Sequence, residues 1–136
     1  MDKVSPATRK TALAVTTLGS FLTSFMGSSI NVALPIIGKE FAIDAIVLSW
    51  IATSYLLAAA MFLVPFGRIA DIYGRKKIFT YGVILYTFSS FLTAIAQSAL
   101  ILILFRVLQG ISGAMIFSTG AAMLISVFPP QQRGRV

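Results

Sequence analysis

The sequence predicts an all-helical protein that crosses a membrane several times, with four transmembrane helices. Its 136 residues are 57% apolar and only 11% charged, whereas soluble domains average roughly 45–50% apolar and about 25% charged residues. The apolar residues also gather into four long stretches, and about 20 residues suffice for a helix to cross roughly 30 Å of hydrocarbon. The lipid bilayer is therefore the first expected partner.

Each apolar stretch has recognisable ends. Asp44 and Ser98 precede the second and fourth stretches and are residue types that cap helix N-termini. Pro129 and Pro130 follow the last stretch and stop it, because the residue before a proline is disfavoured in helices. The four predicted spans are residues 11–37, 46–66, 78–96 and 99–128.

The cations predict how these spans are oriented. Nine of the eleven Lys and Arg residues flank the same ends of the spans, whereas Lys39 lies at the opposite ends and Arg106 lies within a span. Because Lys and Arg favour the cytoplasmic side, we expect residues 1–10 to be a cytoplasmic N-terminus and residues 129–136 to begin a cytoplasmic loop. The protein is expected in the cell membrane, inner or plasma, as a multi-pass protein. The cations form no stripe typical of nucleic-acid binding, so no nucleic-acid partner is expected.

The composition excludes several chemistries. The chain contains no Cys and no His, which excludes His/Cys metal sites, disulfides, and catalysis by Ser-His or Cys-His pairs. No other nucleophile and base are paired, so we expect no enzyme and no cofactor.

Polar residues follow one face of the first span at helical spacing. They are Thr17, Ser20, Ser24, Gly27, Ser28 and Asn31. Such a face either packs against another helix or lines a watery cavity. Pro35, four residues beyond Asn31, lacks the N–H that would bond the Asn31 carbonyl. The Asn31 side chain therefore either bonds that carbonyl and holds a kink, or contacts a substrate.

Arg106 lies roughly 10 Å into the fourth span. A cation there costs at least about 2.5–3.5 kcal/mol unless it snorkels to the outer interface. Gln109, Gly110 and Gly113 share its helix face, which suits a neighbouring helix or a cavity better than lipid. No Asp or Glu lies within any predicted span. Arg106 is therefore predicted to be functional and to meet water, carbonyls, substrate or a partner elsewhere.

The segment between the second and third spans carries one acid among four cations. The cations anchor the topology, but acids contribute little to it. Asp71 lies four residues before Arg75, the spacing of a helical ion pair, although Gly74 favours a turn. A carboxylate at this membrane edge can dock on a neighbouring helix N-terminus and be released when helices rock.

Three motifs, in order along residues 11–136, resemble those of one family. The segment between the second and third spans resembles motif A of the major facilitator superfamily, through Gly67, Asp71, Gly74, Arg75, Lys76 and Lys77. The fourth span resembles motif B, through Arg106, Gln109, Gly110 and Gly113. The end of the first span, from Asn31 to Pro35, resembles the signature of the fourteen-helix drug:proton antiporter branch.

This resemblance implies a fold and a function. The chain would be the first part of an N-terminal six-helix bundle, and its partners would include the missing C-terminal helices of the same transporter. Small molecules or drugs would be exported by alternating access, driven by the proton gradient. Asp71 with Arg75 would hold the outward-open state, and Arg106 would couple protons. Met26 departs from the pattern, because the branch usually carries Asp there, which weakens the expectation of cationic drugs. Whether the transport is antiport or symport stays open.

Two other interpretations remain. A truncated or interaction membrane protein without transport activity would also use the glycine-rich faces. A small four-helix multidrug exporter fits the number of spans, but that family needs a carboxylate in its first span, and residues 11–37 contain none.

Overall fold

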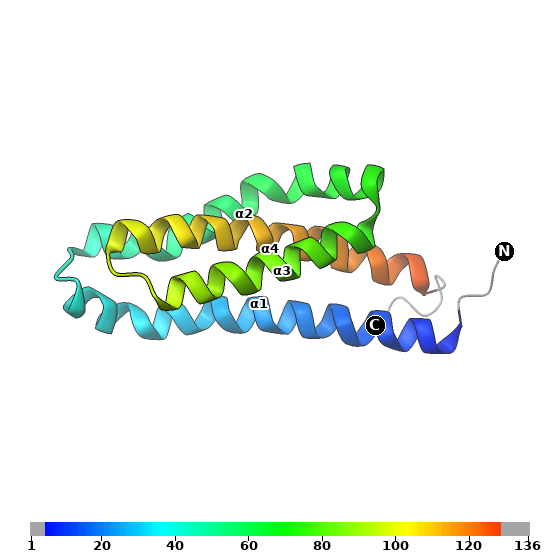
Figure 1. Ribbon diagram of the computed structural model, residues 1–136, viewed down its shortest axis with the longest axis horizontal. Helices are drawn as coiled ribbons and strands as arrows, with labels where there is room; N and C mark the ends of the chain where they lie inside the picture. Colours follow the sequence, from blue (N-terminus) through cyan, green and yellow to red (C-terminus); the bar gives the residue numbers. More distant parts are fainter. Residues whose placement is uncertain (1–4, 129–136) are drawn as a thin grey trace.

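The computed structural model describes residues 5–128, which form four helices without a strand in that range (Figure 1). The helices are α1 (Pro6–Glu40), α2 (Ala45–Tyr73), α3 (Arg75–Ala94) and α4 (Ala99–Val127). The predicted all-helical fold is confirmed. The loop predicted at 129–136 and the first four residues of the predicted N-terminus lie outside the described residues.

The helices run alternately up and down the long axis of the bundle (Figure 1). The start of α1, the α2–α3 turn and the end of α4 lie at one end, and the α1–α2 and α3–α4 connections lie at the other. Helix α4 packs against all three other helices, most extensively against α2 and α3. It also holds more buried residues than any other helix of the described range, so the core of the bundle is organised around α4.

Side-chain caps begin three of the helices. Asp44 Oδ1 accepts a hydrogen bond from the backbone N–H of Val47 at 2.9 Å, and Ser98 Oγ accepts one from Ile101 at 3.3 Å. Both predicted caps are therefore confirmed. Ser5, which the sequence analysis did not single out, caps α1 in the same way.

The connection between α2 and α3 is shorter than expected. The charged residues of this segment suggested a link from 68 to 77, but α2 continues to Tyr73 and α3 begins at Arg75. The turn is made by Gly74 alone, whose φ of 102° favours glycine. Charged residues end an apolar stretch without ending the helix, because the backbone hydrogen bonds of a helix do not depend on the polarity of its side chains. For the same reason α1 extends beyond the predicted 11–37 at both ends.

Helices α1, α2 and α4 are long and apolar enough to cross a membrane. Helix α3, the predicted third span, is the exception in the described part of the chain, because it begins with Arg75, Lys76 and Lys77 and is not apolar enough along its 20 residues. It nevertheless packs extensively along α4. Gly82 permits this close approach, because a Cβ at this position would lie 2.9 Å from Met115 Cβ.

Candidate functional site

Arg106 of α4 lies inside the bundle, with only 2% of its surface exposed. Its Nε donates to the carbonyl oxygen of Ile51 at 3.2 Å, and its Nη1 donates to Gln109 Oε1 at 2.6 Å. The guanidinium carbon lies 4.4 Å from the centre of the Tyr55 ring. The alternative in which Arg106 snorkels to the outer interface is therefore wrong, because all three partners hold the side chain inward.

A chain of hydrogen bonds continues from Arg106 to α3. Gln109 Nε2 donates to Ser90 Oγ at 2.8 Å, and Ser90 Oγ donates to the carbonyl of Tyr86 at 2.7 Å. The Tyr86 hydroxyl then donates to the Thr23 carbonyl of α1 at 3.3 Å. Arg106 and Gln109, which the sequence placed on one helix face, thus belong to a network that connects all four helices.

Sequence reasoning missed the roles of Tyr86 and Ser90. They are separated by four residues and so share a face of α3, but a Tyr and a Ser in an apolar helix are too common to indicate a site. The contact of the Tyr55 ring with the buried cation was likewise not predicted from the sequence.

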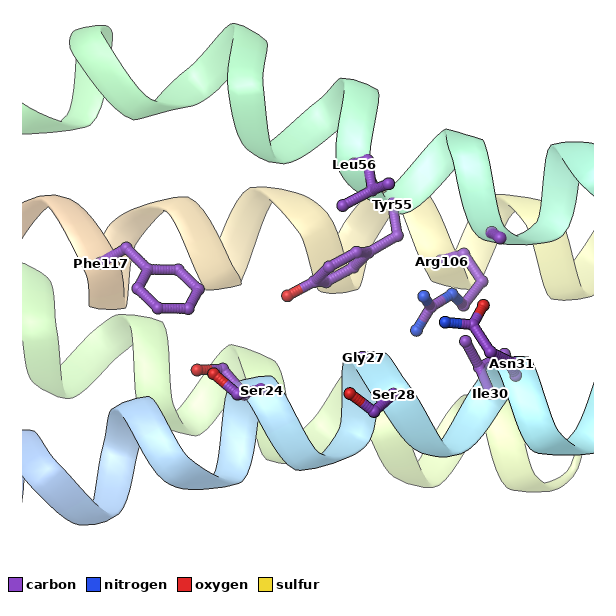
Figure 2. Close-up of a pocket in the computed structure, with 11 residues that line it drawn as sticks. Ser24, Gly27, Ser28, Ile30, Asn31, Tyr55, Leu56, Arg106 and Phe117 are labelled. Carbon is purple, nitrogen blue, oxygen red and sulfur yellow. The ribbon is translucent and has the colours of Figure 1, made fainter.

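A cavity of about 340 Å³ opens beside Arg106 between α1, α2 and α4 (Figure 2). We call it the main cavity. Side chains from α1 form one wall, Tyr55 and Leu56 of α2 face them, and Phe117 closes the cavity toward one end. Its lining residues are Thr23, Ser24, Gly27, Ser28, Ile30, Asn31, Ala52, Tyr55, Leu56, Arg106 and Phe117.

The polar face of α1 lines this cavity rather than a helix contact. Ser24, Gly27, Ser28 and Asn31 all contribute to its wall, whereas an adjacent α1 face is buried through Thr16, Gly19 and Thr23. The sequence left two alternatives for this polar face, helix packing and cavity lining. Cavity lining therefore describes its part from Ser24 to Asn31.

The kink-holding bond, one of the two alternatives left open for Asn31, is not formed. Within residues 5–128 the Asn31 carboxamide makes no side-chain hydrogen bond, and Figure 2 shows it pointing into the cavity beside α1. Helix α1 continues past Pro35 to Glu40, so the helix passes through the proline without a side-chain clamp.

A second cavity of about 240 Å³ lies on the other side of Arg106, between α1, α3 and α4. Met26, Ser90 and Gln109 line it together with Arg106. Arg106 therefore borders both cavities. Gly110 and Gly113, on the same face of α4, instead contact α2 around Tyr55.

The residues that resemble motif A cluster at the opposite end of α4. Arg75 donates from Nε and Nη2 to Asp71 Oδ1 at 3.1 and 3.0 Å, and from Nη1 to the Ala122 carbonyl at 2.9 Å. Arg75 thus connects α2 and α4 from the first turn of α3, with Gly74 providing the turn.

The remaining residues of this cluster contribute less. Gly67 faces Ser118 of α4, and a Cβ there would lie 3.9 Å from Ser118 Cβ. Lys76 and Lys77 are exposed at the start of α3. The Asp71 side chain is 62% exposed, and apart from Arg75 no ion-pair partner is found for it in the described residues. Its docking on another helix N-terminus stays a prediction.

Comparison with known proteins connects this arrangement to a family. The model of the Major Facilitator Superfamily matches residues 16–136. The chain is 34% identical to a probable actinorhodin transporter of Streptomyces coelicolor over 93% of its own length and 22% of the relative's. It is 34% identical to a multidrug resistance protein of Mycobacterium tuberculosis over 90% of its length and 23% of the relative's.

A riboflavin transporter of Clostridioides difficile is 28% identical over 90% of this chain and 27% of its own length. The chain thus spans about a quarter of the length of the curated relatives it matches. The family model nevertheless matches nearly the whole chain, from the first third of α1 through α4. The chain therefore belongs to the major facilitator superfamily.

Proposed function

We propose that this chain forms the first helices of a proton-coupled exporter that moves small molecules by alternating access. The observation that carries this proposal is the buried Arg106, which borders two cavities and is held by neutral groups. An ionisable residue inside a membrane segment is costly and marks a substrate or proton pathway by default. The relatives support transport, and a multidrug resistance protein among them supports export.

Arg106 is proposed to couple protons through its electrostatic field. In a low-dielectric interior, a fixed cation interacts strongly with any other charge nearby. A proton or a charged substrate that enters either cavity therefore changes the energy of Arg106 and of the network that it holds. This network reaches α1, α2 and α3. A change in the energy of Arg106 can therefore alter how all four helices are held together.

The pair of Asp71 and Arg75 is proposed to act as a gate. It lies on a one-residue turn, and Arg75 holds the end of α2 to α4. The exposed Asp71 carboxylate is available to the missing C-terminal helices of the same transporter. Contact with these helices would favour the outward-open state, and separation from them would favour the inward-open state.

The end of the bundle with the gate is proposed to be cytoplasmic, in the cell membrane. Most of the described cations lie at this end, at the start of α1, near the end of α2 and at the start of α3, while Lys39 lies at the other, near the end of α1. This distribution supports the orientation, because cytoplasmic ends carry the excess of Lys and Arg.

Everted membrane vesicles from cells that produce the protein from its own gene test this function. A pH-sensitive dye reports proton release when a substrate is added to energised vesicles. Arg106→Ala should abolish the response while the amount of inserted protein is unchanged. Arg68→Ala, which removes an exposed cation at the bundle end, is the matched control and should retain it. A full response from Arg106→Ala would contradict the coupling role.

A further inference from the structure

We propose that the main cavity selects anionic aromatic molecules over lipophilic cations. This inference names the substrate class of the proposed transporter and therefore rests on the proposed function. Three properties of the cavity carry it: its charge, its free hydrogen-bond donors and its aromatic wall.

The charge of the site is positive. Arg106 is the charged residue among those that line the main cavity and the second cavity. The chain contains four acidic residues. Three of them, Glu40, Asp44 and Asp71, belong to the described residues; they lie at helix ends, and none of these three lines either cavity. A cation that entered the main cavity would meet Arg106 without a compensating carboxylate from residues 5–128, whereas an anion would be attracted.

Part of the Arg106 guanidinium is also free to bind a ligand. Nε and Nη1 have partners, but Nη2 donates to no atom of residues 5–128. Arg carries five N–H donors and no acceptor, so its unused donors require an acceptor from elsewhere. An anionic oxygen is the strongest partner, because hydrogen bonds between ions are shorter and stronger than neutral ones.

The α1 wall adds further donors. Thr16, Thr23 and Ser29 each donate their hydroxyl to a carbonyl of α1. Ser24 and Ser28 make no such bond in the described part of the chain, and Figure 2 shows both side chains directed toward the main cavity. Together with the Asn31 carboxamide, they can donate to a ligand's oxygens.

The opposite wall favours an aromatic ring. Tyr55, Leu56 and Phe117 line it, and Phe117 is 39% exposed as a whole residue. Rings stack or meet edge to face at such surfaces. A volume of about 340 Å³ lies within the range of roughly 300–1,000 Å³ that small-molecule sites occupy. A ring system that carries a carboxylate, sulfonate or phenolate would match both walls.

Met26 makes the charge of the site testable. It lines the second cavity together with Arg106, so an acid at this position would lie close to the same guanidinium. Met26→Asp should therefore neutralise the field that attracts anions, while Met26→Asn has nearly the same shape and no charge. The difference between these two variants isolates the charge from the loss of the methionine.

Equilibrium binding tests the preference without requiring transport. The protein produced from its own gene is purified in detergent, and fluorescence anisotropy is followed with fluorescein and with rhodamine 6G. These dyes share a three-ring frame but carry opposite charges. Fluorescein should bind tighter by about tenfold or more, the effect of one hydrogen bond to a charged group. Met26→Asp should remove this advantage, and Met26→Asn should bind fluorescein tighter than Met26→Asp does.

Each outcome decides the proposal. Tighter or equal binding of rhodamine 6G, or no binding of either dye, would overturn it, as would identical binding to the Asp and Asn variants. Vesicle transport is measured separately. If fluorescein binds as expected but no substrate moves protons, the proposed function fails while the charge preference stands. If vesicles export rhodamine 6G and not fluorescein, transport stands and the substrate class fails.

Discussion

The guanidinium carbon of Arg106 lies 4.4 Å from the centre of the Tyr55 ring, across the interface between α4 and α2. A cation at the centre of a membrane helix costs about 2.5–3.5 kcal/mol on insertion scales. A hydrogen bond to a charged group returns about 1.5–3 kcal/mol, and a cation over a ring returns about 0.5–2 kcal/mol. Two such hydrogen bonds and the ring are therefore enough to keep Arg106 buried without a carboxylate.

Replacing the ring should destabilise this arrangement. Tyr55→Leu keeps an apolar side chain but removes the ring face, so the free energy of unfolding should fall by about 0.5–2 kcal/mol. Tyr55→Phe keeps the ring and is the matched control. Thermal unfolding in detergent, followed by circular dichroism, measures the difference. Equal melting temperatures for the two variants would show that the ring contributes only through its volume.

A second prediction concerns the contact between α2 and α4. A Cβ at Gly110 would collide with the Tyr55 carbonyl oxygen and lie 2.9 Å from Ala58 Cβ. Gly110→Ala should therefore push α2 from α4 and lower the free energy of unfolding by about 1–3 kcal/mol. The readout is thermal unfolding together with the elution volume of the purified protein.

Gly120→Ala is the matched control on the same helix. Its new Cβ would meet Phe79 at 3.8 Å and Thr16 at 4.0 Å, which are ordinary contact distances. Because Ala favours helices over Gly by about 0.8–1 kcal/mol, this variant should be as stable as the native protein or more stable. If both alanine variants behaved alike, the α2–α4 contact would not depend on Gly110.

The fold could be predicted largely because lipid imposes one requirement. Every backbone polar group in the hydrocarbon must be bonded within its own segment, so long apolar stretches indicate helices. The exact helix ends could not be predicted in this way. Arg68 and Asp71 end the apolar stretch, yet they lie inside α2, and the turn is set by the backbone of Gly74.

The candidate site could be predicted in part. Arg106 and Gln109 stood out because charged and amide side chains are rare in membrane helices, and the structure joins them directly. Their partners did not stand out, because a carbonyl such as that of Ile51 is invisible in a sequence. Which residue of α3 meets Gln109 depends on how α3 is rotated against α4. The packing of Gly82 against Met115 sets that rotation, and this packing cannot be read from the sequence.

A third prediction concerns the connection that Arg75 makes between α2 and α4. Arg75 reaches the Asp71 carboxylate and the Ala122 carbonyl from different nitrogens of its planar fork, and Lys, with a single compact ammonium, lacks this fork. Arg75→Lys should therefore speed hydrogen–deuterium exchange in the last turns of α4. The stability of the whole protein should change little, because exposed ion pairs contribute about 0–1 kcal/mol.

Arg68→Lys provides the comparison for this exchange experiment. Arg68 lies near the same end of the bundle and makes no side-chain hydrogen bond or ion pair with residues 5–128. Exchange in α4 should therefore match the native protein. If Arg75→Lys left the last turns of α4 equally protected, the Ala122 contact would contribute nothing to their stability.

The orientation of the bundle can be read with introduced cysteines, because the chain has none of its own. Ala42 lies in the exposed α1–α2 connection, and Tyr73, which is 67% exposed, lies at the opposite end beside Gly74. The cation distribution predicts that Ala42 faces outward and Tyr73 faces the cytoplasm. A membrane-impermeant maleimide should therefore label Ala42→Cys in intact cells and Tyr73→Cys only after permeabilisation. The reverse pattern would place the gate outside the cell, and the cations at that end would then not set the topology.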